Sequence, residues 1–317
     1  MRELLTEVIG GAEESAPYPV GIIFLFFDAL MKMKILGIIG NVQKKETPKV
    51  VNQILAWAFQ KKFQPLVDKD CARLAGSPEV GEDPAIIMNK ADLVIILGGD
   101  GTLLSVVKFL NRPEVPILAI NLGRLGFLTS VTRQELITIL EGFYSGEYQS
   151  EERMLLEARV ERKGEIISQF RALNEVVIGR GVFARLLHFE TFINQQYLTT
   201  YAADGVIIST PTGSTAYSLS AGGPVIYPTL EAILLIPICP HTLTNRPLII
   251  PPTETVSVRA EEKDAELVIT ADGQVNLTPQ PGDILHLRKS DLRIKLIVFP
   301  NRTFYHLLRD KLKWGGQ

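Results

Sequence analysis

A continuous apolar run that ends in a glycine-rich turn is the feature that most constrains the fold of this chain. Leu93-Val94-Ile95-Ile96-Leu97 contains no polar side chain, which is typical of a parallel strand buried on both faces. Gly98-Gly99-Asp100-Gly101-Thr102 follows directly, and the mostly apolar residues 103–110 predict the start of a helix. A strand, a tight turn and a helix in this order predict an open α/β sheet, which binds ligands at the carboxyl ends of its strands.

The turn places one carboxylate, that of Asp100, among three glycines. Gly98, Gly99 and Gly101 lack a Cβ atom, so a phosphate group can approach the backbone, and amides at a helix start favour anions. With Thr102 they are the candidate phosphate-binding residues. Because Asp100 would repel phosphate, it suits a proton acceptor for an attacking hydroxyl or a ligand of magnesium. Helix capping by Asp100 and close packing at the glycines are the alternative explanation.

Bulk properties limit the class of protein. The chain has 317 residues, of which 46% are hydrophobic and 21% charged, and this size favours two domains. A net charge of −2 without a long basic run gives no reason to expect nucleic-acid binding. Cys71 and Cys239 lie far apart and outside any metal-ligand pattern, which favours a cytoplasmic protein.

The first 32 residues form an extension to which we assign no role. Residues 20–27 are strongly apolar, but Asp28 follows them, and a membrane-spanning helix needs about 20 apolar residues. The acidic residues at the start of the chain are unlike the basic start of a secretory signal. We therefore expect no membrane association, and we expect the fold to begin at Met33.

Strands and helices alternate from residue 33 to 145, which predicts a Rossmann-like α/β domain. Strands are expected at 34–39, 64–68, 92–97 and 116–120, and helices near Thr47, at 84–90, after the Asp100 turn and at 133–143. A second glycine loop, 121–128, follows the last of these strands.

Short β-branched runs separated by turn residues dominate after Gly146, which predicts a β-rich, sandwich-like domain over residues 146–292. Strands are expected at 154–161, 166–171, 175–179, 186–193, 205–209, 232–236, 255–259, 266–270 and 283–288. A final strand at 293–299 and a helix at 303–312 have the pattern of the first domain, so residues 293–317 are expected to complete it.

A hydroxyl-rich segment, residues 209–224, follows the expected strand at 205–209. Its backbone amides and hydroxyl groups suit a diphosphate or a ribose, and Tyr217 offers a ring to an aromatic base. Tight helix packing explains Gly222 and Gly223, but it does not explain hydroxyl groups at a strand end. Asn174-Glu175 opens another strand. Since neighbouring residues of a regular strand face opposite sides, both can contact one ligand only if the backbone is irregular there.

Together these motifs resemble the NAD kinase family over residues 33–314. The Gly98–Thr102 turn also occurs in diacylglycerol, sphingosine and ceramide kinases, and related turns occur in phosphofructokinases, so the resemblance implies an α/β domain like those of phosphofructokinases and diacylglycerol kinases. Asp204-Gly205 followed by the segment 210–217 is instead specific to NAD kinases. Asn174-Glu175, the segment 237–241, Arg246-Pro247 and the closing segment 311–315 match the family as well.

The resemblance implies transfer of the terminal phosphoryl group of ATP to the 2′-hydroxyl of the adenosine ribose of NAD, with Asp100 as general base. Magnesium is expected to arrive with the nucleotide, and Asp100 or Glu175 is its expected contact. The family's site lies between two domains and can include residues from a neighbouring subunit, so a homo-oligomer, often a dimer or a tetramer, is implied. The implied NAD-binding residues are Gly101, Asn174, Glu175, Asp204, Thr212, Thr215, Ala216, Tyr217 and Ser220.

Two other functions remain open at this point. A lipid or sugar kinase shares the Asp100 turn but would have an apolar cleft in place of residues 209–220, and an NAD-binding sensor would have lost the turn. A dehydrogenase is disfavoured because no Gly-x-Gly-x-x-Gly follows the first expected strand. The sequence leaves open whether the donor is ATP or polyphosphate, the acceptance of NADH, feedback by NADP(H), the oligomer size and the metal ligands.

Overall fold

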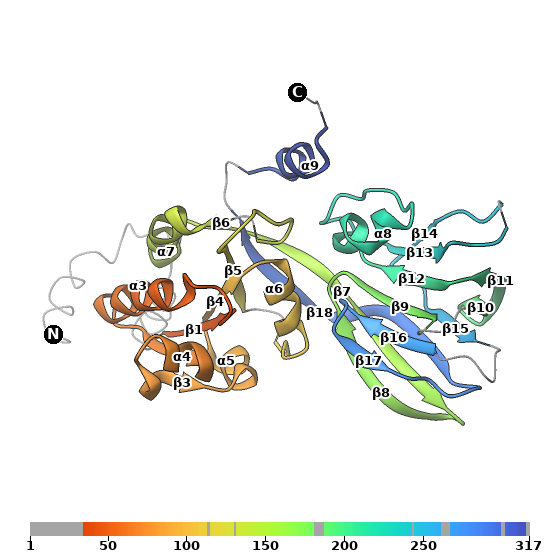
Figure 1. Ribbon diagram of the computed structural model, residues 1–317, viewed down its shortest axis with the longest axis horizontal. Helices are drawn as coiled ribbons and strands as arrows, with labels where there is room; N and C mark the ends of the chain where they lie inside the picture. The colour runs from red at the N-terminus through yellow and green to blue at the C-terminus, as the bar shows by residue number, and fades with distance from the viewer. Residues whose placement is uncertain are drawn as a thin grey trace, which may run out of the picture.

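The computed structural model describes residues 34–112, 115–129, 131–180, 187–242, 244–260, 267–298 and 302–314, and the extension 1–32 lies outside this part. An α/β domain occupies one side of the molecule and a β-rich domain the other (Figure 1). A 12-stranded sheet contains strands of both domains, and a 6-stranded antiparallel sheet belongs to the β-rich domain.

Parallel strands form the centre of the α/β domain, in the order β5, β4, β1, β2, β3. All residues of β4 and β5 are buried, because helices cover both faces of the sheet. One face packs against α3, α4 and α7, and the other against α5 and α6. The elements are β1 (Ile35–Gly40), α3 (Thr47–Gln60), β2 (Gln64–Asp68), α4 (Lys69–Leu74), β3 (Gly81–Glu82), α5 (Pro84–Lys90), β4 (Leu93–Gly98), α6 (Asp100–Val107), β5 (Pro116–Asn121), β6 (Val131–Thr132) and α7 (Leu136–Ser145).

The β-rich domain is a sandwich. Its core lies between the 6-stranded sheet, ordered β14-β13-β12-β9-β16-β17, and the antiparallel part of the large sheet. The strands are β7 (Gln149–Arg162), β8 (Glu165–Ala172), β9 (Glu175–Arg180), β10 (Leu187–Ile193), β11 (Gln196–Ala203), β12 (Gly205–Ser209), β13 (Ile233–Ile238), β14 (Leu248–Ile250), β15 (Val256–Ala260), β16 (Leu267–Ala271) and β17 (Val275–Leu277). The predicted combination of an α/β and a β-rich domain is therefore confirmed.

One long strand, β18 (Ile284–Val298), crosses from one domain to the other. The sequence predicted two strands, 283–288 and 293–299, and this separation is wrong. The polar residues that suggested a break lie at a shift of register between Lys289 and Arg293, while the strand itself continues. It pairs antiparallel with β7 and β15, and Lys295 and Leu296 pair parallel with β5.

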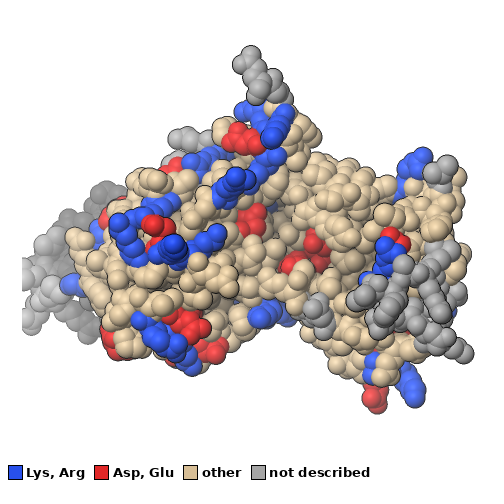
Figure 2. Space-filling model, in the orientation of Figure 1, with Lys and Arg blue, Asp and Glu red and all other residues tan. Residues whose placement is uncertain are grey.

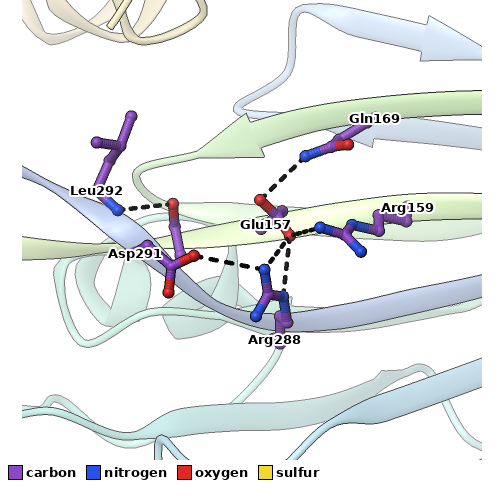
Figure 3. Close-up of polar contacts among 7 residues, drawn as sticks. Glu157, Arg159, Gln169, Arg288, Asp291 and Leu292 are labelled. Atoms are coloured by element: carbon purple, nitrogen blue, oxygen red, sulfur yellow. Dashed lines mark hydrogen bonds and ion pairs between the residues drawn. The ribbon is translucent and has the colours of Figure 1, made fainter. Parts of the chain in front are cut away.

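An ionic network joins β7, β8 and β18 on the outer face of the large sheet (Figure 3). The carboxylate of Glu157, only 5% exposed, accepts from Arg288 Nε at 2.9 Å and Gln169 Nε2 at 3.0 Å, and pairs with Arg159 at 2.8 Å. Several donors around one buried carboxylate satisfy its charge, so the network fixes the register of the long strand.

The last helix, α9 (Phe304–Leu312), contacts both domains. The ring of Phe304 lies 6.4 Å from that of Phe127 in the α/β domain and 5.3 Å from that of Tyr227 in the β-rich domain. Figure 1 shows α9 above the junction of the two domains. The aromatic contacts therefore link the loop after β5 to the segment after β12.

Candidate functional site

A cavity of about 490 Å³ opens at the carboxyl ends of β1 and β4. Open α/β sheets bind ligands at this edge. Lys44 brings a cation to the cavity, and the first turn of α6 brings backbone amides. The lining residues are Gly40, Asn41, Val42, Gln43, Lys44, Gly99, Gly101, Thr102 and Ser105.

The glycines of the turn serve different purposes. A Cβ atom on Gly98 would lie 2.1 Å from Thr102 Oγ1, so close packing against this side chain explains Gly98. No described atom lies within 4 Å of a Cβ atom on Gly99 or Gly101, and both residues line the cavity. Gly99 and Gly101 therefore leave room for a ligand, as the sequence predicts for a phosphate site.

Asp100, the first residue of α6, directs its carboxylate into the loop after β5. Asp100 Oδ2 accepts from the amide of Phe127 at 2.9 Å. Asp100 Oδ1 accepts from the amides of Leu128 at 3.2 Å and Thr129 at 2.9 Å, and from Thr129 Oγ1 at 2.8 Å. The orientation of the carboxylate is therefore set by the second glycine loop, to which the sequence analysis gave no role.

Gly126 makes room for this arrangement. A Cβ atom at this position would lie 1.9 Å from Asp100 Oδ1 and 2.4 Å from Asp100 Cγ. Any side chain at residue 126 would therefore displace the carboxylate of Asp100.

Asn174 and Glu175 lie on an irregular stretch of backbone just before and at the start of β9. The carboxylate of Asp272 accepts the consecutive amides of Leu173 at 2.8 Å, Asn174 at 2.8 Å and Glu175 at 3.2 Å. Three successive N–H groups that point at one carboxylate exclude a regular strand at this point. The backbone is therefore irregular at Asn174 and Glu175, which is the condition for both side chains to contact one ligand.

The hydroxyl-rich segment packs directly against this bend. Thr210 N donates to Asn174 O at 2.8 Å, and Thr210 Oγ1 donates to Leu173 O at 2.6 Å. A Cβ atom on Gly213 would lie 2.3 Å from Asn174 O, so Gly213 is needed for the approach. The segment continues as a short 3₁₀ helix, Thr212–Thr215, and as α8 (Tyr217–Ser220).

Seven buried side-chain polar atoms of the described residues have no hydrogen-bond partner there. Four are arginine Nε atoms elsewhere, and the other three belong to this region: Glu175 Oε2, Thr212 Oγ1 and Ser218 Oγ. Buried polar atoms are rarely left unsatisfied in folded proteins. These three atoms lie on the Asn174-Glu175 bend and the hydroxyl-rich segment. A polar ligand bound there would supply the hydrogen bonds that they lack.

Burial raises the pKa of two carboxyl groups here, that of Glu175 on the bend and that of Asp272, which binds the bend. Desolvation and the nearby charge of Asp272 raise the pKa of Glu175 to about 8, although the backbone amide of Tyr217 acts in the opposite direction. Desolvation raises the pKa of Asp272 to about 6 against the effect of its three backbone amides. At neutral pH Glu175 therefore carries its proton, and it can donate a hydrogen bond.

The turn between β16 and β17 connects this bend to the Asp100 turn. It contains Asp272, and Gln274 Nε2 donates to Gly101 O at 3.1 Å. The structure thus brings the Asp100 turn, the Asn174-Glu175 bend and the hydroxyl-rich segment into one region. In the view of Figure 2, acidic side chains lie in the middle of the molecule where the two domains meet.

Asp204 lies away from the region where these three segments meet. It precedes β12, whereas Ser209 ends this strand beside Glu175, and five residues of strand span about 16 Å. Asp204 forms an ion pair with Arg180 at 3.2 Å. Tyr217 and Ser220 are exposed on α8, while Thr215 and Ala216 are half-buried next to it.

Two further properties concern metals and membranes. Among the described residues, no three His, Cys, Asp or Glu side chains come together as a metal site. Mg²⁺ is commonly held by substrate phosphates with one or two carboxylates. Asp100 lies between the cavity-lining Gly99 and Gly101, and its carboxylate has the chemistry for one such contact. No helix in the described ranges is long and apolar enough to cross a membrane.

Comparisons with known proteins point to one family. Family models described as the ATP-NAD kinase N-terminal and C-terminal domains match residues 36–148 and 173–299. An NAD kinase of Geobacter sulfurreducens is 45% identical over 283 residues, which cover 89% of this chain and 99% of the relative. An NAD kinase of Thermoanaerobacter sp. is 44% identical over 280 residues, 88% of this chain and 99% of the relative.

Solved structures resemble the fold as well. Yeast NADH kinase complexed with NADH has a TM-score of 0.81 and 27% identity, over 90% of this chain and 89% of that chain. An NAD kinase from Archaeoglobus fulgidus in complex with ATP has a TM-score of 0.69 and 23% identity, over 88% of this chain and 98% of that chain. The latter similarity concerns the fold alone.

Proposed function

The chain belongs to the NAD kinase family, and on this premise we propose that Asp100 is the general base of its reaction. The enzyme phosphorylates NAD to NADP. We place the accepting hydroxyl at the 2′ position of the adenosine ribose. The observation that carries the proposal is the fixed carboxylate of Asp100 at the carboxyl end of β4, next to the cavity.

Asp100 would act through Oδ2. From the described residues this oxygen accepts one amide, whereas Oδ1 accepts three donors. A carboxylate oxygen has about two lone-pair positions, so Oδ2 keeps one for the ribose hydroxyl. A general base of this kind typically contributes about 10²–10⁴-fold in rate.

The unpartnered polar atoms of Glu175, Thr212 and Ser218 support NAD binding at the bend and the hydroxyl-rich segment. A ribose and an adenine together offer the donors and acceptors that these atoms lack. The proposed contacts are Gly101, Asn174, Glu175, Thr212, Thr215, Ala216, Tyr217 and Ser220, as the sequence predicts.

Because Glu175 is proposed to donate a hydrogen bond to NAD only when it is protonated, we expect NAD binding to depend on pH. Above about pH 8 its carboxyl group ionises, so the hydrogen bond that it donates to NAD is lost and the KM for NAD rises with pH. Glu175→Gln keeps a donor at every pH, and its KM should stay nearly constant between pH 7 and pH 9.5. Steady-state kinetics over this range measure the effect, and parallel curves for both proteins would contradict it.

ATP is the proposed donor, and its phosphates would occupy the cavity beside Gly98, Gly99, Gly101 and Thr102. When bound, magnesium shields the phosphate charge so that a hydroxyl can approach. Because Lys44 lines the cavity, Lys44→Ala should raise the KM for ATP about tenfold and leave the KM for NAD unchanged. The test is NADP formation from NAD, magnesium and either ATP or polyphosphate. Absence of NADP with both donors would refute the function.

The position of Asp204 supports a homo-oligomer. Because Asp204 lies at the opposite end of β12 from the Glu175 bend, we place it at the NAD site of a neighbouring copy, toward the nicotinamide. Sedimentation of the purified enzyme would test for a dimer or a tetramer. The two unpaired cysteines, Cys71 and Cys239, support a cytoplasmic location.

A further inference from the structure

We propose that Thr129, oriented by Asn121, is a positioning residue that holds Asp100 so that the proton of the ribose hydroxyl goes to Oδ2. This inference rests on the proposed role of Asp100 as general base and adds two residues to it. Neither residue lines the cavity; both act through the carboxylate.

The amide of Asn121 has one defined orientation. Its Oδ1 accepts from the amide of Gly123 at 2.6 Å, and its Nδ2 donates to Arg124 O at 2.6 Å. If the amide were reversed, its NH₂ group would face the N–H of Gly123 and its oxygen would face the carbonyl oxygen of Arg124. Neither pair can form a hydrogen bond, so the network fixes the orientation.

This orientation decides the direction of the Thr129 hydroxyl. Asn121 Nδ2 lies 2.8 Å from Thr129 Oγ1 and can only donate. The hydroxyl has one proton, and since its oxygen accepts from Asn121, that proton points to Asp100 Oδ1 at 2.8 Å. Asn121, Thr129 and Asp100 therefore form a directed relay of hydrogen bonds.

Burial makes this relay hard to replace by water. Thr129 is 0% exposed and Asn121 is 6% exposed. With the Thr129 hydroxyl in place, Asp100 Oδ1 has three donors, which occupy its lone pairs. Without the hydroxyl, Oδ1 would keep the amides of Leu128 and Thr129 but lose the shortest of its three hydrogen bonds. The ionised carboxylate would then be less stabilised and less firmly oriented.

The test compares three substitutions of Thr129 in the full-length enzyme. Thr129→Val keeps the shape and removes the hydroxyl. Thr129→Ser and Thr129→Ala lack the same methyl group and differ from each other only in the hydroxyl. We expect Thr129→Val and Thr129→Ala to lower kcat about 10- to 100-fold with the KM for NAD within twofold. Thr129→Ser should keep most of the wild-type kcat.

The pH–rate profile distinguishes positioning from a general structural role. Loss of a donor destabilises the ionised carboxylate, so the acidic limb of the kcat profile should move to higher pH in Thr129→Val and Thr129→Ala but not in Thr129→Ser. Thr132→Val is the matched control, because it removes a hydroxyl bond of 2.7 Å to Glu135, outside the site. Its kcat and profile should equal those of the wild type.

Several results would overturn the proposal. One is a kcat and an acidic limb of Thr129→Val that match those of Thr132→Val. Another is an equal loss of kcat in Thr129→Ser and Thr129→Ala. If Thr129→Val does not fold, the comparison of Thr129→Ser with Thr129→Ala still tests the proposal. Full turnover by an Asp100→Asn variant would instead reject the general-base role itself, so the two failures are distinguishable.

Discussion

Asp100→Asn is expected to lower kcat by about 10²–10⁴-fold, the usual contribution of a positioned base. The amide has the shape of the carboxylate, but its nitrogen cannot accept a proton from the ribose hydroxyl. Its oxygen should take the place of Oδ1, where three donors converge, and its NH₂ group would then meet the Phe127 amide and the substrate. The dissociation constant of NAD, measured by calorimetry without ATP, should change less than threefold.

A matched control is Asp83→Asn. Asp83 caps α5 by accepting the amide of Ala85 at 2.9 Å, and Asn is an equally good cap. Its kcat should equal that of the wild type. If the kcat of Asp100→Asn were within tenfold of that of Asp83→Asn, Asp100 would not be the proton acceptor.

Patterns that are local in the sequence predicted their elements well. The apolar run before Asp100 and the helix after it appear as β4 and α6, because burial on both faces and a tight turn leave few other conformations. The short helix α4 (Lys69–Leu74) and the strand β11 were not predicted. Four residues of α4 are polar or exposed, and packing on β2 and β3 stabilises it. The division into domains at particular residues stays a prediction.

The candidate site was predicted less completely, because its decisive contacts are distant in sequence. Asp272 lies 98 positions from Asn174, and the sequence analysis assigned it no role. Nothing in a single sequence indicates which backbone amides a carboxylate will bind. The glycine loop 121–128 was visible as a pattern, yet its contact with Asp100 depends on the order of β4 and β5 in the sheet.

Gly126→Ala is the second variant with a large expected effect. The new Cβ atom would lie 1.9 Å from Asp100 Oδ1, far below van der Waals contact, so either the carboxylate turns away or the loop moves. Both changes separate Asp100 from its donors. A displacement of about 1 Å at a reacting group costs on the order of 10²-fold in rate, and we expect a loss of kcat of this size with little change in the KM for ATP.

Gly123→Ala is the control within the same loop. Its Cβ atom would meet Lys44 Nζ at 3.7 Å, an ordinary contact, and neither Gly123 nor Gly126 has a positive φ, so alanine fits the backbone at both positions. Circular dichroism should give similar melting curves for the two variants, which separates the effect on Asp100 from a loss of fold. In the Asp100→Asn background Gly126→Ala should cost almost nothing more, because the base it displaces is already absent. Equal kcat values of Gly126→Ala and Gly123→Ala would show that the orientation of the Asp100 carboxylate does not limit the reaction.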